Sequence, residues 1–172
     1  PIADFRWAPK QFLVSKNGDR VQFFYEKFGR SPARFSVVDR SLSTNPSLEL
    51  GLWPAVTQIS DLLITDWENR TDPKLNGKPL KFWQDDFSRA IAISPDKNSF
   101  LLGSKFFLCL FDRRGNEIWK VRLPGEGFAV NISGDGRFAL AALGDGTIRW
   151  YRMKDGKELL ALFPHPDKKR WI

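Results

Sequence analysis

The sequence contains a single cysteine, Cys109, and a single histidine, His165, in 172 residues. One cysteine excludes an internal disulfide, so nothing in the chain requires an oxidising compartment, and we expect a cytoplasmic protein. Because metal sites need several ligands close together, a lone cysteine and a lone histidine predict no metal and no cofactor. No apolar run approaches the roughly 20 residues of a membrane span, and the N-terminal residues do not form a signal-peptide pattern. We therefore expect no association with a membrane.

Amphipathic helical periodicity is also missing, since no segment of a dozen residues repeats its apolar positions at helical spacing. Aromatic residues are abundant instead, with 15 phenylalanines and 7 tryptophans. These residue types favour β-strands. The sequence therefore predicts an all-β protein with almost no helix.

The clearest pattern lies between Ala129 and Phe163, where four short apolar stretches alternate with three turns. The turn Gly144-Asp145-Gly146 supplies residues that tolerate positive φ, as a tight hairpin requires. The stretch from Arg137 to Leu143 is apolar and rich in alanine, as a buried strand should be. This segment therefore predicts a four-stranded antiparallel meander.

A second copy of this pattern precedes the first, from Arg89 to Gly125. Ser94 matches Ser133 at an offset of 39 (133 minus 94), and Gly115 matches Gly156 at an offset of 41 (156 minus 115). Ser15 lies 79 residues before Ser94, about two periods earlier. A period near 40 residues with four strands per repeat is the signature of β-propeller blades.

We therefore predict a β-propeller-like array of about four four-stranded antiparallel blades, as part of a larger or oligomer-completed propeller. The predicted blades span residues 5–48, 49–86, 87–125 and 126–165, and residues 166–172 would begin a further strand. In the first half, strands are predicted at 11–15, 19–26, 33–40, 61–67 and 80–83, with an irregular connection or an edge strand over 41–60.

Residues with expected structural roles recur in these repeats. Turn aspartates bond nearby backbone groups, glycines supply positive φ, and Trp67, Trp83 and Trp119 are expected to pack between sheets. Trp53 and Trp171 have weaker repeat context and are predicted at an interface or an edge. The predicted turn and blade positions are Asp96, Gly115, Asp135, Asp145, Gly146, Trp150 and Gly156.

The segment Asp145-Gly146-Thr147-Ile148-Arg149-Trp150-Tyr151 resembles the WD40 repeat family, and Leu110-Phe111-Asp112 resembles that family's Leu-Trp-Asp ending. More narrowly, residues 62–172 resemble the WD40 modules of large bacterial proteins that also carry caspase-like peptidase domains. The Gly-His pair of the family is absent from both clear repeats. The resemblance implies a non-catalytic scaffold that binds other proteins.

A caspase-like enzyme would need a cysteine and a histidine, but neither residue here fits that role. Cys109 lies inside the apolar stretch KFFLCLFD, where burial suppresses the reactive thiolate. His165 lies in a proline-bounded turn, Phe163-Pro164-His165-Pro166. We therefore predict no catalytic residues, a structural role for Cys109 and a structural or solvated role for His165.

The predicted function is a protein-interaction scaffold in a bacterial multidomain protein. One alternative is a regulatory or substrate-recruiting segment for an attached caspase-like peptidase. The net charge of +7 leaves a second alternative, a nucleic-acid or polyanion binder, which we do not favour because a broad basic face is lacking. Candidate contact residues beyond Trp53 and Trp171 are Lys168, Lys169 and Arg170, with Arg30 and Arg34 in the polyanion alternative. An open array should also expose apolar ends, and we expect it either to self-associate or to require an adjacent domain of its parent protein.

Overall fold

The computed structural model describes residues 2–6, 9–47, 50–81 and 85–172. Its described residues form four antiparallel sheets, with two short 3-10 turns, η1 (Pro9–Gln11) and η2 (Lys27–Gly29). The prediction of an all-β, propeller-like array is confirmed. No helix in these described ranges has the length and apolar character needed to cross a membrane.

Each sheet is named here by its order along the chain. The first has the strand order β4-β3-β2-β1-β5, the second β6-β7-β8, the third β12-β11-β10-β9 and the fourth β13-β14-β15-β16. Two of the four sheets therefore have the four strands that the repeat predicts.

The bounds are β1 (Leu13–Ser15), β2 (Arg20–Glu26), β3 (Arg30–Ser36), β4 (Ser41–Thr44), β5 (Leu52–Trp53), β6 (Ile64–Thr65), β7 (Lys74–Leu75), β8 (Lys78–Pro79), β9 (Ser88–Ile93), β10 (Ser99–Ser104), β11 (Phe107–Asp112), β12 (Glu117–Arg122), β13 (Gly127–Ile132), β14 (Phe138–Leu143), β15 (Ile148–Arg152) and β16 (Glu158–Leu162).

Strand β14 shows why the fourth sheet forms where the sequence predicts it. Ala139 and Ala141 face the core shared with the third sheet, whereas Leu140 and Ala142 face the core shared with the first. A strand buried on both faces reads as a continuous apolar run, and small side chains let both neighbouring sheets approach. The alanine-rich run therefore marks the middle of the stack.

The first half of the chain departs from the predicted strands. The strand expected over 33–40 is β3, which ends at Ser36, because the Ser36 hydroxyl bonds Asp39 at 2.6 Å and turns the chain. Val38 is consequently 71% exposed. The strand expected over 61–67 is present only as the two residues of β6 (Ile64–Thr65). The strand expected over 80–83 lies partly outside the described residues, because residues 82 and 83, including Trp83, are not described.

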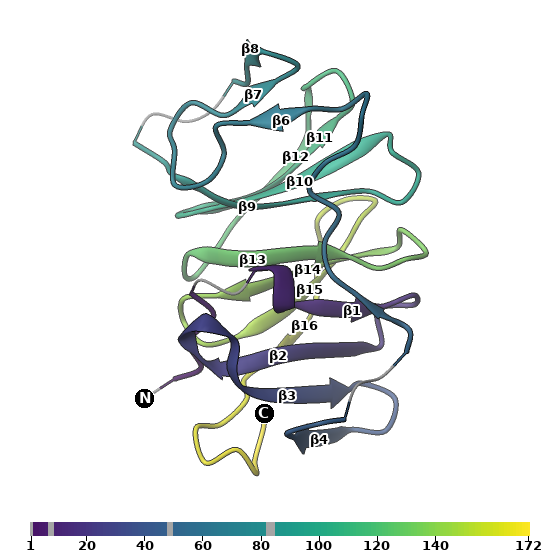
Figure 1. Ribbon diagram of the computed structural model, residues 1–172, viewed down its shortest axis with the longest axis vertical. Coiled ribbons are helices and arrows are strands. Elements are labelled where there is room, and N and C mark those ends of the chain that lie inside the picture. The colour runs from purple at the N-terminus through teal and green to yellow at the C-terminus, as the bar shows by residue number, and fades with distance from the viewer. Residues whose placement is uncertain (1, 7–8, 48–49, 82–84) are drawn as a thin grey trace.

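Three apolar cores fix the order in which the sheets stack. One core joins the second sheet to the third, another joins the third to the fourth, and the last joins the fourth to the first. The spatial order is therefore second, third, fourth, first, as Figure 1 shows from top to bottom. The first sheet lies beside the last one, at the opposite end of the stack from the sheet that follows it in sequence.

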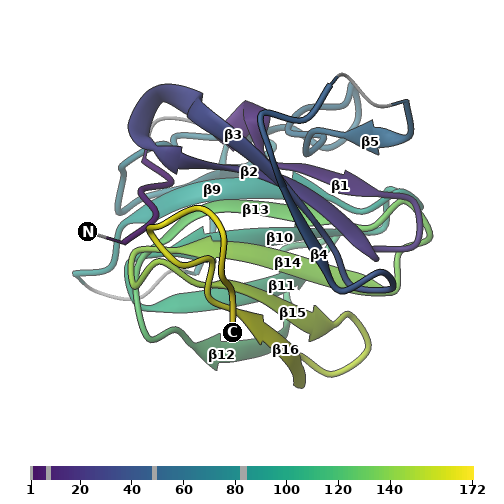
Figure 2. The ribbon, with the colours of Figure 1, turned by 90° about the horizontal axis from the view of Figure 1, so that it is seen from below.

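The connection between the first and second sheets crosses the stack along one end of the inner strands. Trp53 pairs with Val14 of β1, and its carbonyl accepts a hydrogen bond from Asn131 Nδ2 at 2.9 Å. Further along, the Val56 carbonyl accepts the Ile93 N–H at 2.7 Å. The connection therefore holds the first, fourth and third sheets together, and Figure 2 shows β5 beside β1 at this end.

The outer face of the first sheet carries both polar and apolar side chains, since Phe24 and Pro32 are paired there as well as Gln22 and Arg34. Gln22 and Arg34 are paired across β2 and β3 on this face, opposite the side that carries Val21 and Phe35. The Arg34 guanidinium also donates to the Ser47 carbonyl at 2.8 Å. Polar groups on the outer face are what a terminal repeat needs to remain soluble.

The C-terminal residues fold back and do not begin a strand of another sheet. Phe163 and Ile172 exchange backbone hydrogen bonds of 2.8 and 3.1 Å, and Pro164 bridges Trp171. Trp171 packs edge-on against Phe35, with ring centroids 4.8 Å apart. The expectation of a further strand over 166–172 is therefore replaced by a closing hairpin.

Candidate binding cleft

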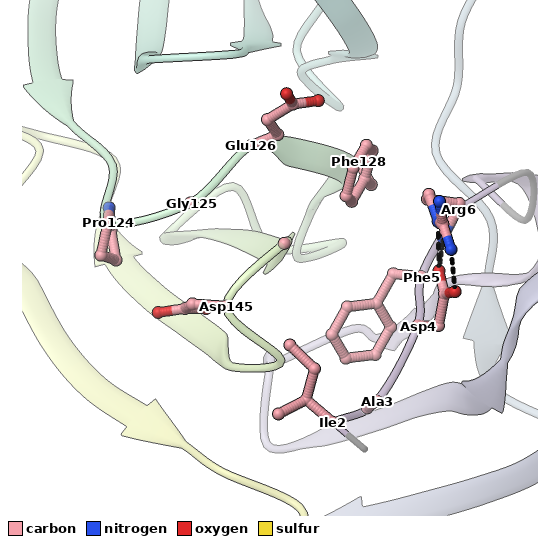
Figure 3. Close-up of a pocket in the computed structure, with 11 residues that line it drawn as sticks. Ile2, Ala3, Asp4, Phe5, Arg6, Pro124, Gly125, Glu126, Phe128 and Asp145 are labelled. Atoms are coloured by element: carbon pink, nitrogen blue, oxygen red, sulfur yellow. Dashed lines mark hydrogen bonds and ion pairs between the residues drawn. The ribbon is translucent and has the colours of Figure 1, made fainter.

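A cleft of about 440 Å³ opens at one end of the strands, between the N-terminal segment and the loops of the fourth sheet. Figure 3 shows its lining side chains, and Phe5 and Phe128 extend toward it from opposite walls. A second hollow of about 370 Å³ lies beside it, and three residues line both hollows: Arg6, Glu126 and Phe128. The other residues that line the second hollow are Pro9, Glu68, Asn69 and Arg89. Because the two hollows share three lining residues, we treat them as one groove and call it the cleft.

The N-terminal wall is residues 2–6, which are held against β2 and its turn. The Asp4 N–H donates to the Tyr25 carbonyl at 3.1 Å, and the Arg6 carbonyl accepts the Phe28 N–H at 3.2 Å. Phe5 is 4% exposed and packs against Phe23 in the core between the fourth and first sheets. This wall is therefore anchored both by the backbone and by the core.

The opposite wall consists of the β12–β13 connection and the β14–β15 turn. The Gly144 N–H donates to the Glu126 carbonyl at 2.8 Å. A Cβ on Gly125 would lie 2.6 Å from the Asp145 backbone nitrogen, so no larger residue fits there without movement. Close contact between the two loops fixes the shape of this wall.

Two ion pairs hold charged side chains in place along the cleft. Arg6 donates twice to the Asp4 carboxylate, at 2.9 and 2.6 Å, and these bonds lower the pKa of Asp4 below its usual value. Arg89 contacts Glu126 at 2.8 Å and also bonds the Asn69 side chain. These pairs orient polar groups beside the half-buried Phe128 ring.

The cleft is acidic although the chain as a whole is basic. Four carboxylates line it, those of Asp4, Glu68, Glu126 and Asp145, against the two guanidinium groups of Arg6 and Arg89. The formal balance of this lining is −2 (four negative minus two positive), compared with +7 for the chain. Arg149, outside the lining, pairs with Asp145 at 3.4 Å, and counting it brings the balance to −1. A positively charged side chain of a ligand is therefore favoured here.

Sequence reasoning did not find this cleft. Its residues come from the N-terminus, from the segment 68–69 and from three separate points between residues 89 and 145. No spacing in the sequence connects them. Gly144 and Asp145 were noted in advance, but only as turn residues, and the Asp145 Oδ1 accepts hydrogen bonds from the Thr147 N–H at 3.0 Å and the Thr147 hydroxyl at 2.6 Å.

Of the other predicted turn positions, Gly146 lies against Ile2 of the cleft wall, and the rest lie away from the cleft. Asp96 and Asp135 accept hydrogen bonds from the hydroxyls of Ser94 and Ser133, at 2.5 and 2.6 Å. The bond from Ser94 is the main cause of a lowered pKa at Asp96. Gly115, Gly146 and Gly156 have φ of 87°, 83° and 72° in hairpin turns, and Trp150 is 4% exposed between the fourth and first sheets.

The predicted contact residues do not gather into one surface. Trp53 is 52% exposed at the inner edge of the first sheet, whereas Trp171 packs on Phe35. Lys168 Nζ contacts Glu26 at 3.3 Å, and Arg170 contacts Asp167 at 2.6 Å.

Cys109 and His165 lie in different parts of the array. Cys109 is fully buried in the core between the second and third sheets, and this burial raises the pKa of its thiol. His165 lies in the C-terminal hairpin, where its Nδ1 accepts the Asp167 N–H at 3.2 Å. The prediction that Cys109 is buried is confirmed, and its low reactivity stays a prediction. Among the described residues, no group of three acidic, cysteine or histidine side chains is placed to hold a metal ion.

No protein-family model matches this chain, and no curated protein matches its sequence. Among solved structures, it is similar to BamB from Moraxella catarrhalis, with 19% sequence identity and a TM-score of 0.46. The likeness covers 62% of this chain and 36% of that one. The chain therefore matches little more than a third of the length of that protein.

Proposed function

We propose that this chain is a non-catalytic protein-interaction module, and that its cleft binds an extended segment of a partner protein. The observation that carries this proposal is the continuous groove between residues 2–6 and the loops around Glu126 and Gly144. Its walls are fixed by core packing, close loop contacts and ion pairs. A preformed groove loses little conformational entropy when a ligand binds.

The side chains of the cleft support a peptide that carries both apolar and basic residues. Phe128 presents an aromatic face, and Ile2 is 47% exposed at the other wall. Glu68, which lines the second hollow, is an exposed carboxylate. An apolar side chain would pack on Phe128 while a lysine or arginine side chain approaches the carboxylates.

The cleft has no arrangement suited to nucleophilic catalysis. Its lining includes neither Cys109 nor His165, and the carboxylates of Asp4 and Glu126 are engaged by arginines. The Asp145 carboxylate is paired with Arg149 at 3.4 Å, and Glu68 lies on a different segment. A regulatory role beside a caspase-like peptidase and a cytoplasmic location stay predictions.

Binding of a polyanion is disfavoured by the partners of the basic run. Lys168 is engaged by Glu26, and Arg170 by Asp167. Two of the three consecutive bases therefore have an acidic neighbour that a polyanion would have to displace.

A displayed library of random linear peptides, selected on the dilute purified chain, tests the proposal. We expect the enriched peptides to combine an aromatic or aliphatic residue with lysine or arginine. Phe128→Ala should weaken their binding at least tenfold, as truncation of a central aromatic contact does (about 1.4 kcal/mol per tenfold). Glu126→Gln should weaken the binding of basic peptides and make it less sensitive to salt.

Matched controls lie elsewhere on the same sheet. Phe138 is also a half-buried phenylalanine packed against the core between the fourth and first sheets, but it begins β14 at the other end of the strands. Asp155 pairs with Arg152 in the β15–β16 turn, at the end of β15 opposite the cleft. Phe138→Ala and Asp155→Asn should leave peptide binding unchanged. Failure to enrich any peptide, or an equal loss in the control variants, would overturn the proposal.

A further inference from the structure

The turn between β2 and β3 exposes an aromatic residue in an unfavourable backbone conformation. Phe28 has φ 63° and ψ 24°, and its side chain is 58% exposed. A bulky residue in the left-handed region is a steric outlier, where glycine or asparagine is the usual choice. None of the three cores formed by the described residues includes Phe28. The fold itself therefore gains little from this ring.

The Phe28 turn lies beside the cleft. The Phe28 N–H donates to the Arg6 carbonyl, and Arg6 lines both hollows of the cleft. In Figure 1, the β2–β3 turn and the β12–β13 connection are at the same end of the strands. A strained, exposed aromatic residue next to a binding groove is an observation that points to a contact with another molecule.

The charges around the Phe28 turn are opposite to those of the cleft. Lys27 and Arg30 flank Phe28, with Lys27 Nζ 5.5 Å from the centre of its ring. Glu26 lies 4.0 Å from Arg30, so these three charged residues have a formal balance of +1. The side chain of Arg30 is 65% exposed. The cleft has a formal balance of −2 in its lining, from four carboxylates and two guanidinium groups. One molecule thus carries both a basic aromatic projection and an acidic groove.

We propose that a second copy of this chain occupies the cleft, with Phe28 of each copy inserted into the cleft of the other. Because the projection and the cleft lie at one end of the array, a two-fold axis between them satisfies both contacts at once. The hollow of about 440 Å³ is within the roughly 300 to 1,000 Å³ of ordinary ligand pockets, so a phenyl ring fits. The proposal uses the same groove as the proposed function, and assigns it a specific occupant.

Sedimentation equilibrium of the full chain, from micromolar to millimolar concentration, tests this assignment. We expect a reversible monomer–dimer equilibrium that weakens as salt is added, because charge complementarity contributes to it. Phe28→Gly should weaken dimerisation at least tenfold and at the same time raise the melting temperature of the monomer, because glycine adopts positive φ without steric cost. Lys27→Glu should also weaken dimerisation.

The matched control is Val38→Gly, which removes another exposed apolar side chain from a turn of the same sheet. Val38 is 71% exposed in the turn between β3 and β4, at the other end of the strands. This variant should dimerise like the unaltered chain.

A chain that remains monomeric up to millimolar concentration would overturn the proposal, as would a Phe28→Gly dimer of unchanged affinity. If Phe28→Gly lowers the melting temperature, Phe28→Asn decides, because asparagine tolerates positive φ. A Phe28→Asn chain that is stable but still dimeric would refute the proposal, and one that is stable and monomeric would support it. A monomer that binds the selected peptides would refute the dimer alone and leave the proposed function standing.

Discussion

The indole Nε1 of Trp150 donates a hydrogen bond of 2.7 Å to the carbonyl of Gly18, 132 residues earlier in the chain. Trp150 lies on β15 of the fourth sheet, and Gly18 lies in the β1–β2 turn of the first sheet. The bond therefore joins the last sheet to the first across their shared core. A similar hydrogen bond of 2.8 Å runs from Trp119 Nε1 of the third sheet to the carbonyl of Met153, which follows β15 of the fourth sheet. The interface between the third and fourth sheets and the interface between the fourth and first sheets therefore each contain a tryptophan that donates a hydrogen bond across it.

The Trp150 bond predicts a large loss of stability on Trp150→Phe. This change removes the donor, leaves the Gly18 carbonyl without its partner and opens space in a core where Trp150 is 4% exposed. The free energy of unfolding in urea should fall by about 2 to 4 kcal/mol. Trp53→Phe is the control, since Trp53 is 52% exposed and should change stability by less than about 0.5 kcal/mol. Equal effects of the two changes would contradict this account.

Three serines occupy the same turn position in the first, third and fourth sheets, and replacing any one of them should lower stability by a similar amount. The hydroxyls of Ser15, Ser94 and Ser133 accept the backbone N–H five residues later, at 3.0 Å in each case. Each hydroxyl also donates to the aspartate of its turn. Replacing any one of them by alanine should cost about 1 to 3 kcal/mol in the free energy of unfolding, because a buried N–H loses its acceptor. Ser41→Ala, at an exposed position of β4, should cost nothing measurable.

The third and fourth sheets have different residues, Lys97 and Gly136, at equivalent turn positions. Substitutions at these two positions should change stability in opposite directions. Lys97 has φ 62° at the turn position where the fourth sheet has Gly136 with φ 72°. Lys97→Gly should therefore raise the free energy of unfolding by about 1 kcal/mol, and Gly136→Lys should lower it by a similar amount. A Cβ at Gly136 would meet nothing within 4 Å, so the effect comes from the backbone alone. Thermal unfolding of both variants measures it, and the same sign for both would refute the explanation.

Burial of Cys109 predicts a loss of stability at alkaline pH. Desolvation raises the pKa of its thiol in the folded chain above the ordinary value of 9.0, so the unfolded chain loses this proton first. The contribution is fully present below pH 9 and falls by about 1.4 kcal/mol per pH unit as the pH rises further. Desolvation acts in the same direction on Tyr151 and raises the pKa of Tyr25 to about 12.

Urea unfolding between pH 8 and about pH 10 measures this effect. Cys109→Ala should retain the part due to the tyrosines but show a shallower decline in the free energy of unfolding, by about 1 kcal/mol at the upper end. In the unaltered chain, thiol reagents should label Cys109 slowly in the native state and rapidly after denaturation. Rapid native labelling at neutral pH would refute its burial.

Much of the fold could be predicted from the sequence because it depends on local patterns. The meander between Ala129 and Phe163 follows from apolar runs separated by glycine and aspartate turns, and the structure has β13 to β16 there. Ser15, Ser94 and Ser133 align at offsets near one and two periods because their turns use the same hydrogen bonds. The burial of Cys109 follows equally from the apolar strand that contains it. The division into four units at the predicted boundaries stays a prediction.

Only the tertiary structure decided how the sheets are ordered and where a ligand can bind. Strand patterns specify which faces are apolar but not which apolar faces meet, so the contact of the first sheet with the fourth could not be read from the repeat. The short strand at Ile64–Thr65 and the end of β3 at Ser36 depend on turns and neighbours that a strand pattern does not contain. The cleft joins Arg6, Arg89 and Glu126, which become neighbours because separate sheets stack with their strand ends together. Local sequence determines the sheets, whereas the cleft depends on long-range packing between them.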